Sequence, residues 1–319
     1  MLIKTFKQWE LPGIKPTPET IFLNRREVIK ALGLGAVAIL AGCETQGPEA
    51  VKNLLGGFKS ESDYKVSNIL NNKYKMDRQI TNEQKATRFN NFYEFSTKKD
   101  DVYLKVDKFR ISPWSVVVDG LVNNPMTFDL DNLKNRFTLE ERLYRFRCVE
   151  AWAMAVPWSG FPLADLIKMV DPKPEATHLR FETFNRPDEA PNQNKKSLPW
   201  PYEEGLTIQE AMNELSFIST GMYAKPLEKQ NGAPVRLVVP WKYGFKNIKS
   251  IVRISFIEKQ PGTFWNRLVP DEYGFEANVN PKVPHPRWSQ ETERLIDTGE
   301  RIPTLLYNGY AEQVAHLYK

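Results

Sequence analysis

Five short segments of the chain concentrate apolar and β-branched residues, and several of them alternate apolar with polar positions as a half-buried strand does. They are residues 114–119, 144–152, 178–184, 235–239 and 251–257. We expect a β-strand over each of them. The proline-rich stretch 270–286 contains too many helix- and strand-breaking residues for regular structure, so we expect it to wrap the domain as an ordered loop.

Two further segments carry apolar residues at the i, i+3, i+4, i+7 spacing of an amphipathic helix. The first, residues 163–170, follows Pro162, and proline is favoured at a helix start. The second, residues 208–215, follows a capping box formed by Thr207 and Glu210. We expect both apolar faces to belong to the core. Few helices among scattered strands predict a strand-rich α+β fold rather than a regular βαβ alternation.

Composition sets the size and class of the protein. With 319 residues, 41% of them apolar, the chain can bury one large core or two small ones. We see no internal repeat and predict a single catalytic domain over residues 76–319. Two cysteines and three scattered histidines exclude a disulfide scaffold and argue against a zinc site. The chain also has no C-x-x-C-H motif, so we expect no haem or iron–sulfur cluster on it.

The first 43 residues have the pattern of an export signal. Arg25 and Arg26 precede an uncharged run, residues 31–42, that is shorter than the roughly 20 apolar residues of a membrane span. The pair resembles a twin-arginine signal, which suits a protein that folds and takes up a cofactor before export. The run ends in Leu-Ala-Gly-Cys43, which resembles a lipobox and predicts a lipid anchor. An ordinary amphipathic helix, or cleavage nearby without lipid, is the alternative.

The export signal predicts a periplasmic location, and the segment that follows it is polar. Residues 44–75 are polar and lack periodicity, so we expect a flexible tether there. The first 42 residues hold six of the 44 basic and three of the 39 acidic residues, which leaves 38 and 36, a net charge of +2. This balance gives no electrostatic reason to expect a nucleic-acid partner.

Cys148 is the one cysteine left if Cys43 is removed or lipidated, and an unpaired thiol in an oxidising compartment needs an explanation. Nearby guanidinium groups of Arg145 and Arg147 favour the thiolate, which is a nucleophile or a soft metal ligand. A small buried apolar residue is the plainer explanation. In an extended segment Cys148 would share one face with the residues at 150 and 152, and Arg147 would point away.

The available partners separate the two thiolate roles. A thiol nucleophile usually needs a histidine base, and the nearest, His178, is 30 residues away in sequence. A thiol reductase needs a second cysteine to resolve its intermediate. A metal ligand needs only one thiolate if an organic cofactor supplies the other donors. Metal plus cofactor is therefore the more economical interpretation of Cys148.

Three motifs then carry a resemblance to a known family. Residues 147–152 (RCVEAW) and 156–163 (VPWSGFPL) resemble the molybdenum-cofactor domain of the sulfite oxidase superfamily. Residues 90–95 (NNFYEF) and 231–246 (NGAPVRLVVPWKYGFK) resemble one branch of it, the catalytic subunits of bacterial periplasmic protein-methionine-sulfoxide reductases. The resemblance runs from about residue 76 to the C-terminus. The lipobox departs from that branch, whose leaders end in a conventional cleavage site.

The resemblance implies a sulfite-oxidase-type molybdopterin-binding fold and one Mo-molybdopterin per chain, with Cys148 as the protein ligand of the metal. The cofactor contacts that it implies are Asn90, Tyr93 and Glu94 to the pterin, Thr183 from a neighbouring strand, Asn231 and Arg236 at the far end, and Asn247, Ile248 and Lys249 at the terminal phosphate. Fixed cations suit a phosphate. Without the resemblance we would assign Arg236, Lys246 and Lys249 to the solvated surface and Asn90 and Tyr93 to a loop.

The resemblance also implies a reaction, the reduction of methionine sulfoxide in oxidised periplasmic proteins by oxygen-atom transfer to molybdenum. A membrane-bound haem subunit would supply electrons, to a monomer or to a heterodimer with that donor. Glu150 would supply a proton or fix a water, with a salt bridge to Arg145 or Arg147 as its alternative role. Two rival functions remain: a sulfite dehydrogenase of the same superfamily, marked by several arginines around an oxyanion, and a cofactor-free periplasmic binding lipoprotein.

Overall fold

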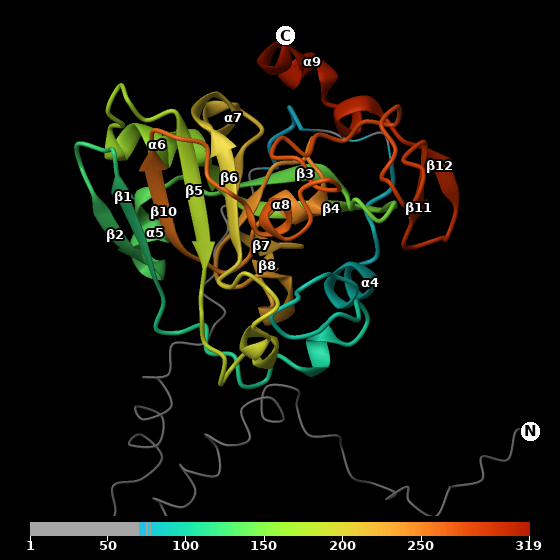
Figure 1. Ribbon diagram of the computed structural model, residues 1–319, viewed down its shortest axis with the longest axis horizontal. Helices are drawn as coiled ribbons and strands as arrows, with labels where there is room; N and C mark the ends of the chain where they lie inside the picture. The colour runs from blue at the N-terminus through green and yellow to red at the C-terminus, as the bar shows by residue number, and fades with distance from the viewer. Residues whose placement is uncertain (1–69, 75, 77) are drawn as a thin grey trace, which may run out of the picture. The chain divides into compact units, whose positions relative to one another are not determined.

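Two β-sheets assembled from distant parts of the sequence form the frame of the protein (Figure 1). The computed structural model describes residues 70–74, 76 and 78–319. The strands of the two sheets are β1 (Ser115–Gly120), β2 (Met126–Asp129), β3 (Glu140–Arg147), β4 (Trp152–Pro162), β5 (His178–Thr183), β6 (Glu203–Thr207), β7 (Phe217–Met222), β8 (Lys225–Pro226), β9 (Arg236–Val238), β10 (Ile251–Ile257), β11 (Thr292–Leu295) and β12 (Arg301–Pro303). The predicted export signal, lipobox and nearly all of the predicted tether lie outside the described residues.

The helices that accompany these strands are short. They are α4 (Glu83–Arg88), α5 (Leu130–Arg136), α6 (Leu163–Val170), α7 (Ile208–Met212), α8 (Phe264–Leu268) and α9 (Ala311–Val314). Single turns of 3-10 helix include η4 (Lys229–Asn231) and η5 (Gly244–Lys246). In the part of the chain that the structure describes, no helix has the length and apolar character needed to cross a membrane.

Both sheets mix parallel and antiparallel neighbours. The first has the order β2-β1-β10-β5-β6, in which β1 and β10 run parallel. The second has the order β12-β11-β4-β7-β8, with β3 paired to β4 and β9 to β7, and with β11 parallel to β4. Segments before, between and after the strands carry the helices, so the predicted strand-rich α+β fold is confirmed.

The strand predictions hold where one apolar run stands alone. The observed β1, β5, β9 and β10 agree with the predicted ranges to within one residue at each end. The prediction of a single strand over 144–152 is wrong, because β3 ends at Arg147 and β4 begins at Trp152. The intervening turn, Cys-Val-Glu-Ala, contains none of the glycine, proline or asparagine that usually marks one. Ala151 nevertheless adopts a positive φ of 64° there.

The two helix predictions have different outcomes. Helix α6 covers the predicted residues and buries its whole apolar face. Helix α7 has both hydrogen bonds of the predicted capping box but ends at Met212, whose side chain is 39% exposed rather than part of the core. Leu215 reaches the core from the turn that follows. The proline-rich stretch 270–286 is loop, as predicted, and buries Tyr273, Val279 and His285.

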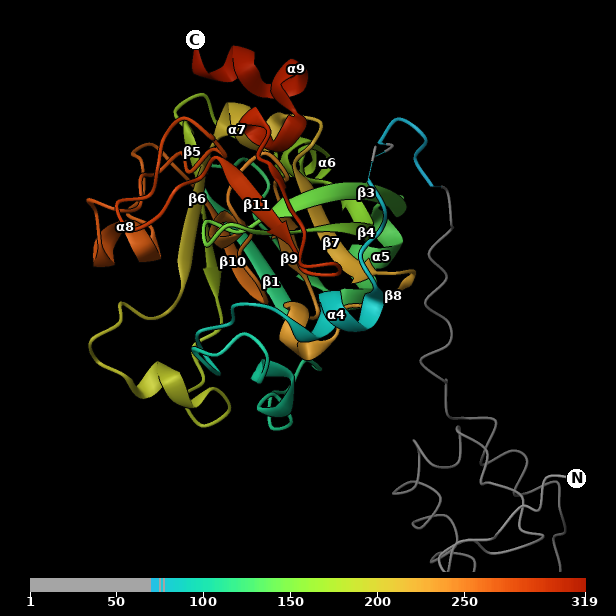
Figure 2. The same ribbon diagram turned by 90° about the vertical axis from the view of Figure 1, so that its right-hand side faces the viewer.

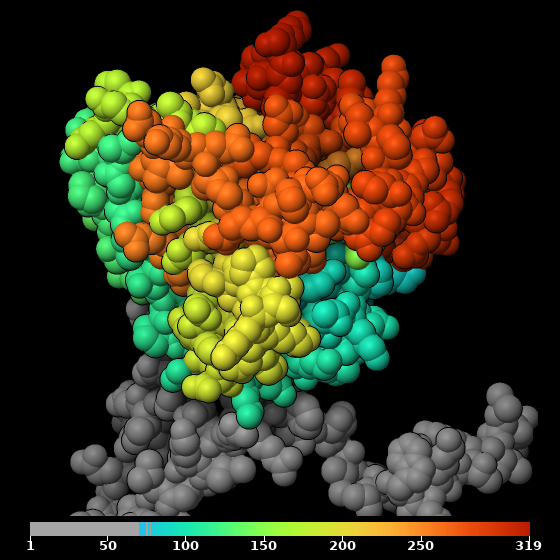
Figure 3. Space-filling view, in the orientation of Figure 1, coloured from blue at the N-terminus to red at the C-terminus, as the bar shows by residue number. Residues whose placement is uncertain are grey.

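The C-terminal segment closes the fold around the turn that carries Cys148. Strand β11 pairs with the first residues of β4, as Figure 2 also shows. In the space-filling view the orange and red C-terminal residues cover much of one face and meet the residues drawn in teal (Figure 3). The sheets and this covering segment share one continuous hydrophobic core, which therefore fixes the position of the turn.

Candidate active site

A cavity with about 870 Å³ of empty space, counted out to solvent, lies between the loop after α4, the β3–β4 turn and the segment from η4 to residue 249. Its wall combines aromatic rings with a small number of polar side chains, as small-molecule and cofactor sites do. The predicted site residues that line it are Asn90, Tyr93, Glu94, Cys148, Glu150, Asn231, Arg236, Asn247, Ile248 and Lys249. Thr183 is not among the residues that line the cavity. Its hydroxyl donates to the carbonyl of Ser250 at 3.0 Å. Its predicted cofactor contact stays a prediction.

The turn between β3 and β4 is held by the C-terminal segment. The carbonyl of Val149 accepts hydrogen bonds from Trp288 Nε1 at 2.8 Å and from Gln290 Nε2 at 2.7 Å. The guanidinium of Arg147 lies 3.1 Å from the carboxylate of Glu293, and both side chains are buried. These contacts fix the turn from outside the cavity, so Cys148, only 4% exposed, is presented on a rigid support.

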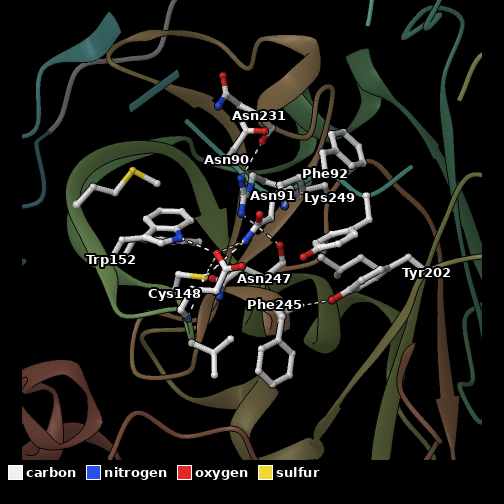
Figure 4. A pocket seen from close by; sticks show the side chains of 18 of the residues that line it. Asn90, Asn91, Phe92, Cys148, Trp152, Tyr202, Asn231, Phe245, Asn247 and Lys249 are labelled. Carbon is white, nitrogen blue, oxygen red and sulfur yellow. Dashed lines mark hydrogen bonds between the residues drawn. The ribbon is translucent and has the colours of Figure 1, made fainter. Parts of the chain in front are cut away.

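A polar cluster surrounds the Cys148 sulfur (Figure 4). The amide of Asn91 lies 3.6 Å from Cys148 Sγ and donates to Glu150 Oε2 at 3.0 Å. Trp152 Nε1 donates to the same carboxylate oxygen at 3.0 Å, and Lys99 Nζ lies 3.1 Å from Glu150 Oε1. Cys148, Glu150 and Trp152 are thus neighbours as expected, but across a turn rather than along one strand face. The alternative salt bridge of Glu150 to Arg145 or Arg147 is wrong, because its cation is Lys99.

The ionisation of this cluster differs from the expectation of a free thiolate. Burial, reinforced by the charge of Glu150, raises the pKa of Cys148 to about 12, and the opposing effect of Arg147 and Lys99 is smaller. Burial also opposes ionisation of Glu150, but hydrogen bonds from Asn91 and Trp152 and the charge of Lys99 hold its pKa below the usual value. The chain alone therefore keeps a thiol beside a carboxylate. Deprotonation of Cys148 requires a bound cation.

The other end of the cavity contains polar atoms without partners. Figure 4 shows Asn231 and Asn90 at this end, away from Cys148 and Trp152. Among the described residues, Asn90 Oδ1, Asn231 Oδ1, Arg236 Nε and Trp158 Nε1 are buried and accept or donate no hydrogen bond. Buried polar atoms are normally paired. Four of them lining one cavity indicate that a polar ligand completes this end.

This end also carries the positive charge of Arg236, which no carboxylate of the described residues pairs with. The Arg236 guanidinium donates to the carbonyls of Asn231 and Asn247, at 2.8 and 3.2 Å. Burial lowers its pKa to about 9. Burial and the charge of Arg236 lower the pKa of Lys249 to about 7. Burial disfavours the charged forms of both side chains, and an anion bound between them would offset this cost.

Local structure prepares Lys249 and the segment before it for that role. Lys249 Nζ donates to the carbonyl of Asn91 at 2.7 Å, which links the two sides of the cavity. Gly232 has a φ of +94°, and a Cβ there would lie 2.7 Å from Lys249 Cβ, so only glycine lets the lysine pass. The Asn247 side chain accepts from the amide of Val239 at 2.7 Å and thus braces the backbone.

Sequence patterns placed several of these residues wrongly or missed them. Arg236 and Lys246 are 3% and 1% exposed, so the surface assignment that patterns alone would give them is wrong; Lys246 pairs with Glu204 at 2.8 Å. Asn91 was overlooked although it stands inside the NNFYEF motif. Lys99 was missed because nothing in its own polar segment signals a partner 51 residues later. Its backbone carbonyl also accepts from the amide of Asn90 at 3.0 Å.

Comparison with known families identifies the fold. Residues 103–265, just over half of the 319, match the family of the oxidoreductase molybdopterin binding domain. The chain belongs to this family. The predicted molybdopterin-binding fold of sulfite-oxidase type is thereby confirmed, and the chain contains an oxidoreductase molybdopterin binding domain. The match favours a cofactor-binding domain over the rival of a cofactor-free binding lipoprotein.

Among solved structures, the chain is similar to the sulfane dehydrogenase SoxCD from Paracoccus pantotrophus. The two are 19% identical, with a TM-score of 0.41 over 48% of this chain and 40% of that chain. This protein therefore spans less than half the length of the chain it matches.

The residues present fit the cofactor that the molybdopterin-binding family implies. Within the described residues no three histidine, cysteine or acidic side chains could together hold a metal ion, so Cys148 offers a single soft ligand. An organic cofactor that brings its own donors matches such a site. The unpartnered amide oxygens of Asn90 and Asn231 suit the N–H donors of a pterin, and the cations Arg236 and Lys249 suit its phosphate.

Proposed function

We propose that this oxidoreductase reduces methionine sulfoxide in exported proteins. The motifs at residues 90–95 and 231–246 support this assignment, because they resemble reductases of that kind. One sulfoxide consumes two electrons and two protons and yields one thioether and one water. Bound molybdopterin would supply the two-electron exchange at the metal. The return of an apolar methionine side chain would repair an oxidised core or interface.

The chain's own residues divide the remaining work. Cys148 would hold the metal, and Asn90, Tyr93, Glu94, Asn231, Arg236 and Lys249 would hold the organic part of the cofactor. Glu150 stands between a cation and the reacting side of the cavity, with Oε1 near Lys99 Nζ and Oε2 near Cys148 Sγ, 3.7 Å away. A proton can pass along this carboxylate from the solvent side to the substrate oxygen.

The observation that favours a sulfoxide over sulfite is the charge next to Cys148. Glu150 is ionised at neutral pH, and its carboxylate would repel a sulfite dianion but not a neutral sulfoxide. A sulfite site would need several arginines around the metal. The described residues of the cavity wall include a single arginine, Arg236. Its guanidinium donates to the carbonyls of Asn231 and Asn247.

Three assays of the purified, cofactor-loaded protein test the proposal. Elemental analysis should find one molybdenum per chain. Reduced viologen dye should drive the reduction of methionine sulfoxide in a peptide, and sulfite should give no turnover with an oxidant such as ferricyanide. Turnover with sulfite and none with any sulfoxide would replace the proposal with the sulfite dehydrogenase. A Cys148→Ser protein serves as the matched inactive control in both directions.

We further propose export by the twin-arginine pathway, a lipid anchor at Cys43 and electron delivery by a membrane-bound haem subunit. Residues 25, 26 and 43 and the uncharged run between them support the first two. The double substitution Arg25→Lys and Arg26→Lys should keep the precursor in the cytoplasm, because a receptor reads the pair and not its charge. The intact mass of the mature wild-type chain should include acyl chains, and a mass without them would end the lipoprotein proposal.

A further inference from the structure

Two surface hollows continue the cavity past Cys148, and we propose that together they bind the polypeptide on either side of the oxidised methionine and prefer acidic residues there. This inference rests on the function proposed above. We call the two hollows the flank groove. Outside the cavity wall its residues are Gln84, Lys85, Arg88, Phe89, Lys99, Asp100, Tyr103, Trp288, Arg294 and Ile296.

Shared residues make the groove continuous with the active site. The nearer hollow is lined by Glu150 and Trp152, which also line the cavity. The farther hollow shares Phe89 and Arg294 with the nearer one. A substrate whose sulfoxide enters beside Cys148 can therefore place its neighbouring residues along this path. A free amino acid would occupy the cavity alone.

The base of the groove is aromatic and fixed. The rings of Phe89 and Trp152 meet edge to face with centroids 5.1 Å apart. Trp288 stacks on the buried His285 at 3.8 Å, and its Nε1 donates to the carbonyl of Val149. Rigid aromatic surfaces bind the apolar parts of a peptide at a low cost in side-chain entropy. This base provides contact area for an extended segment.

The rim of the groove is positive. Lys85, Arg88, Lys99 and Arg294 stand against a single acidic residue outside the cavity, Asp100. Lys99 is paired with Glu150, whereas within the described residues no carboxylate pairs with Arg88 or Arg294. Arg88 packs over the ring of Tyr103 at 5.1 Å. Two unpaired guanidinium groups beside an aromatic base complement a segment with aspartate or glutamate near the sulfoxide.

The test compares peptides that differ only in charge. Each contains one methionine sulfoxide, flanked by aspartate in one peptide and by asparagine in the other, and free methionine sulfoxide is the third substrate. The cofactor-loaded enzyme receives electrons from reduced viologen dye, so docking of a protein donor does not enter the rate. At low salt we expect the aspartate peptide to have a kcat/KM about two- to fivefold higher than the asparagine peptide. The preference should shrink in 0.5 M salt, since exposed charges are screened.

Variants assign the preference to the groove. In the double variant Arg88→Gln with Arg294→Gln the ratio of the two kcat/KM values should fall to about one, whereas Arg294→Lys should keep it. Arg136→Gln, at the exposed end of α5 on the other sheet, is the control and should keep the wild-type ratio. Because Arg294 is half-buried in β11, the single change of the exposed Arg88 decides the question if the double variant does not fold.

The outcomes separate this inference from the proposed function. Equal kcat/KM values for both peptides, with free methionine sulfoxide still reduced, would overturn the flank groove and leave the reductase intact. A wild-type preference that persists in the Arg88 and Arg294 variants would also overturn it. Reduction of no sulfoxide at all would remove the proposed function and this inference with it.

Discussion

Two buried arginines belong to the two ends of the cavity and have opposite surroundings. Arg147, next to Cys148, meets the carboxylate of Glu293 at 3.1 Å and the amide oxygen of Gln290 at 2.8 Å. Arg236 donates hydrogen bonds to the carbonyls of Asn231 and Asn247, its Nε has no partner among the described residues, and none of their carboxylates pairs with it. One charge is thus neutralised within the protein, and the other is not.

The difference separates structure from binding. A buried charge without a counter-ion is costly, and proteins keep one where a ligand supplies the opposite charge. The turn at the Cys148 end is held within the chain itself, because the C-terminal segment binds its backbone and pairs with Arg147. The Arg236 end becomes complete only when a polar, anionic group binds. The same side chain type would therefore stabilise the fold at one end and hold the proposed cofactor at the other.

The largest expected effect comes from Cys148→Ser. The substitution keeps the volume of the side chain and leaves the contacts behind the turn untouched, but an alcohol is a poor soft-metal ligand. We expect sulfoxide reduction to fall by more than the roughly 10- to 100-fold typical of residues that only support a metal ligand. Thermal unfolding of the cofactor-free protein should match the wild type. Turnover at the wild-type rate would show that Cys148 is not the ligand.

Arg147→Met tests whether the paired arginine is structural. The change leaves Glu293 buried with only Arg78, 2.9 Å away, as its cation. Breaking a buried ion pair typically costs about 3–5 kcal/mol, so we expect the free energy of unfolding to fall by about 3 kcal/mol. Denaturant unfolding should show the same loss with and without cofactor. A loss confined to the loaded protein would place Arg147 among the binding residues instead.

Arg236→Met is the counterpart and should behave in the opposite way. Replacement of an unpaired buried charge by an apolar side chain is often neutral or stabilising, so cofactor-free protein should keep or gain stability. Retention of molybdopterin through gel filtration should drop, since the cation proposed to bind the phosphate is gone. A loss of about 3 kcal/mol in the cofactor-free protein, equal to that of Arg147→Met, would erase the proposed distinction.

The same contrast explains what the sequence could predict. Cys148 stands out as an unpaired cysteine and β10 as an isolated apolar run, so both follow from local pattern, whereas Arg236 follows only from the family resemblance. The partners were not, because Glu293 lies 146 residues after Arg147 and no periodicity links them. The Cys148 turn was missed because its residues are as apolar as the strands beside it. Burial of Arg236 is invisible to a reading in which arginine belongs at the surface.

The pH dependence of stability should reveal the buried lysine at the Arg236 end of the cavity. Burial lowers the pKa of Lys249 to about 7 from 10.5, so between these values the unfolded chain binds more protons than the folded one. Stability of the cofactor-free protein should therefore rise as the pH increases from 7 to 10. Burial also lowers the pKa of Lys242, to about 8, so wild type must be compared with Lys249→Met. Identical slopes in the two proteins would contradict the assignment to Lys249.

The smallest expected effect is at Lys99, which places a positive charge beside Glu150 at the Cys148 end of the cavity. Lys99 Nζ lies 3.1 Å from Glu150 Oε1, and about a quarter of each side chain is exposed, so solvent screens the pair. Lys99→Met removes one of the groups that lower the pKa of Glu150. The limb of the pH–rate profile set by Glu150 should then move to higher pH, by less than about one unit.

The measurement is kcat/KM for free methionine sulfoxide against pH, with reduced viologen dye as electron donor, because this substrate does not reach the flank groove. Lys98→Met is the matched control, since Lys98 is exposed and is not among the groups that shift the pKa of Glu150. An unchanged profile in Lys99→Met would mean that Asn91 and Trp152 alone set the ionisation of Glu150. The Glu150 carboxylate would then be stabilised by hydrogen bonds alone, without the charge of Lys99. The contrast with the Arg236 end would be larger.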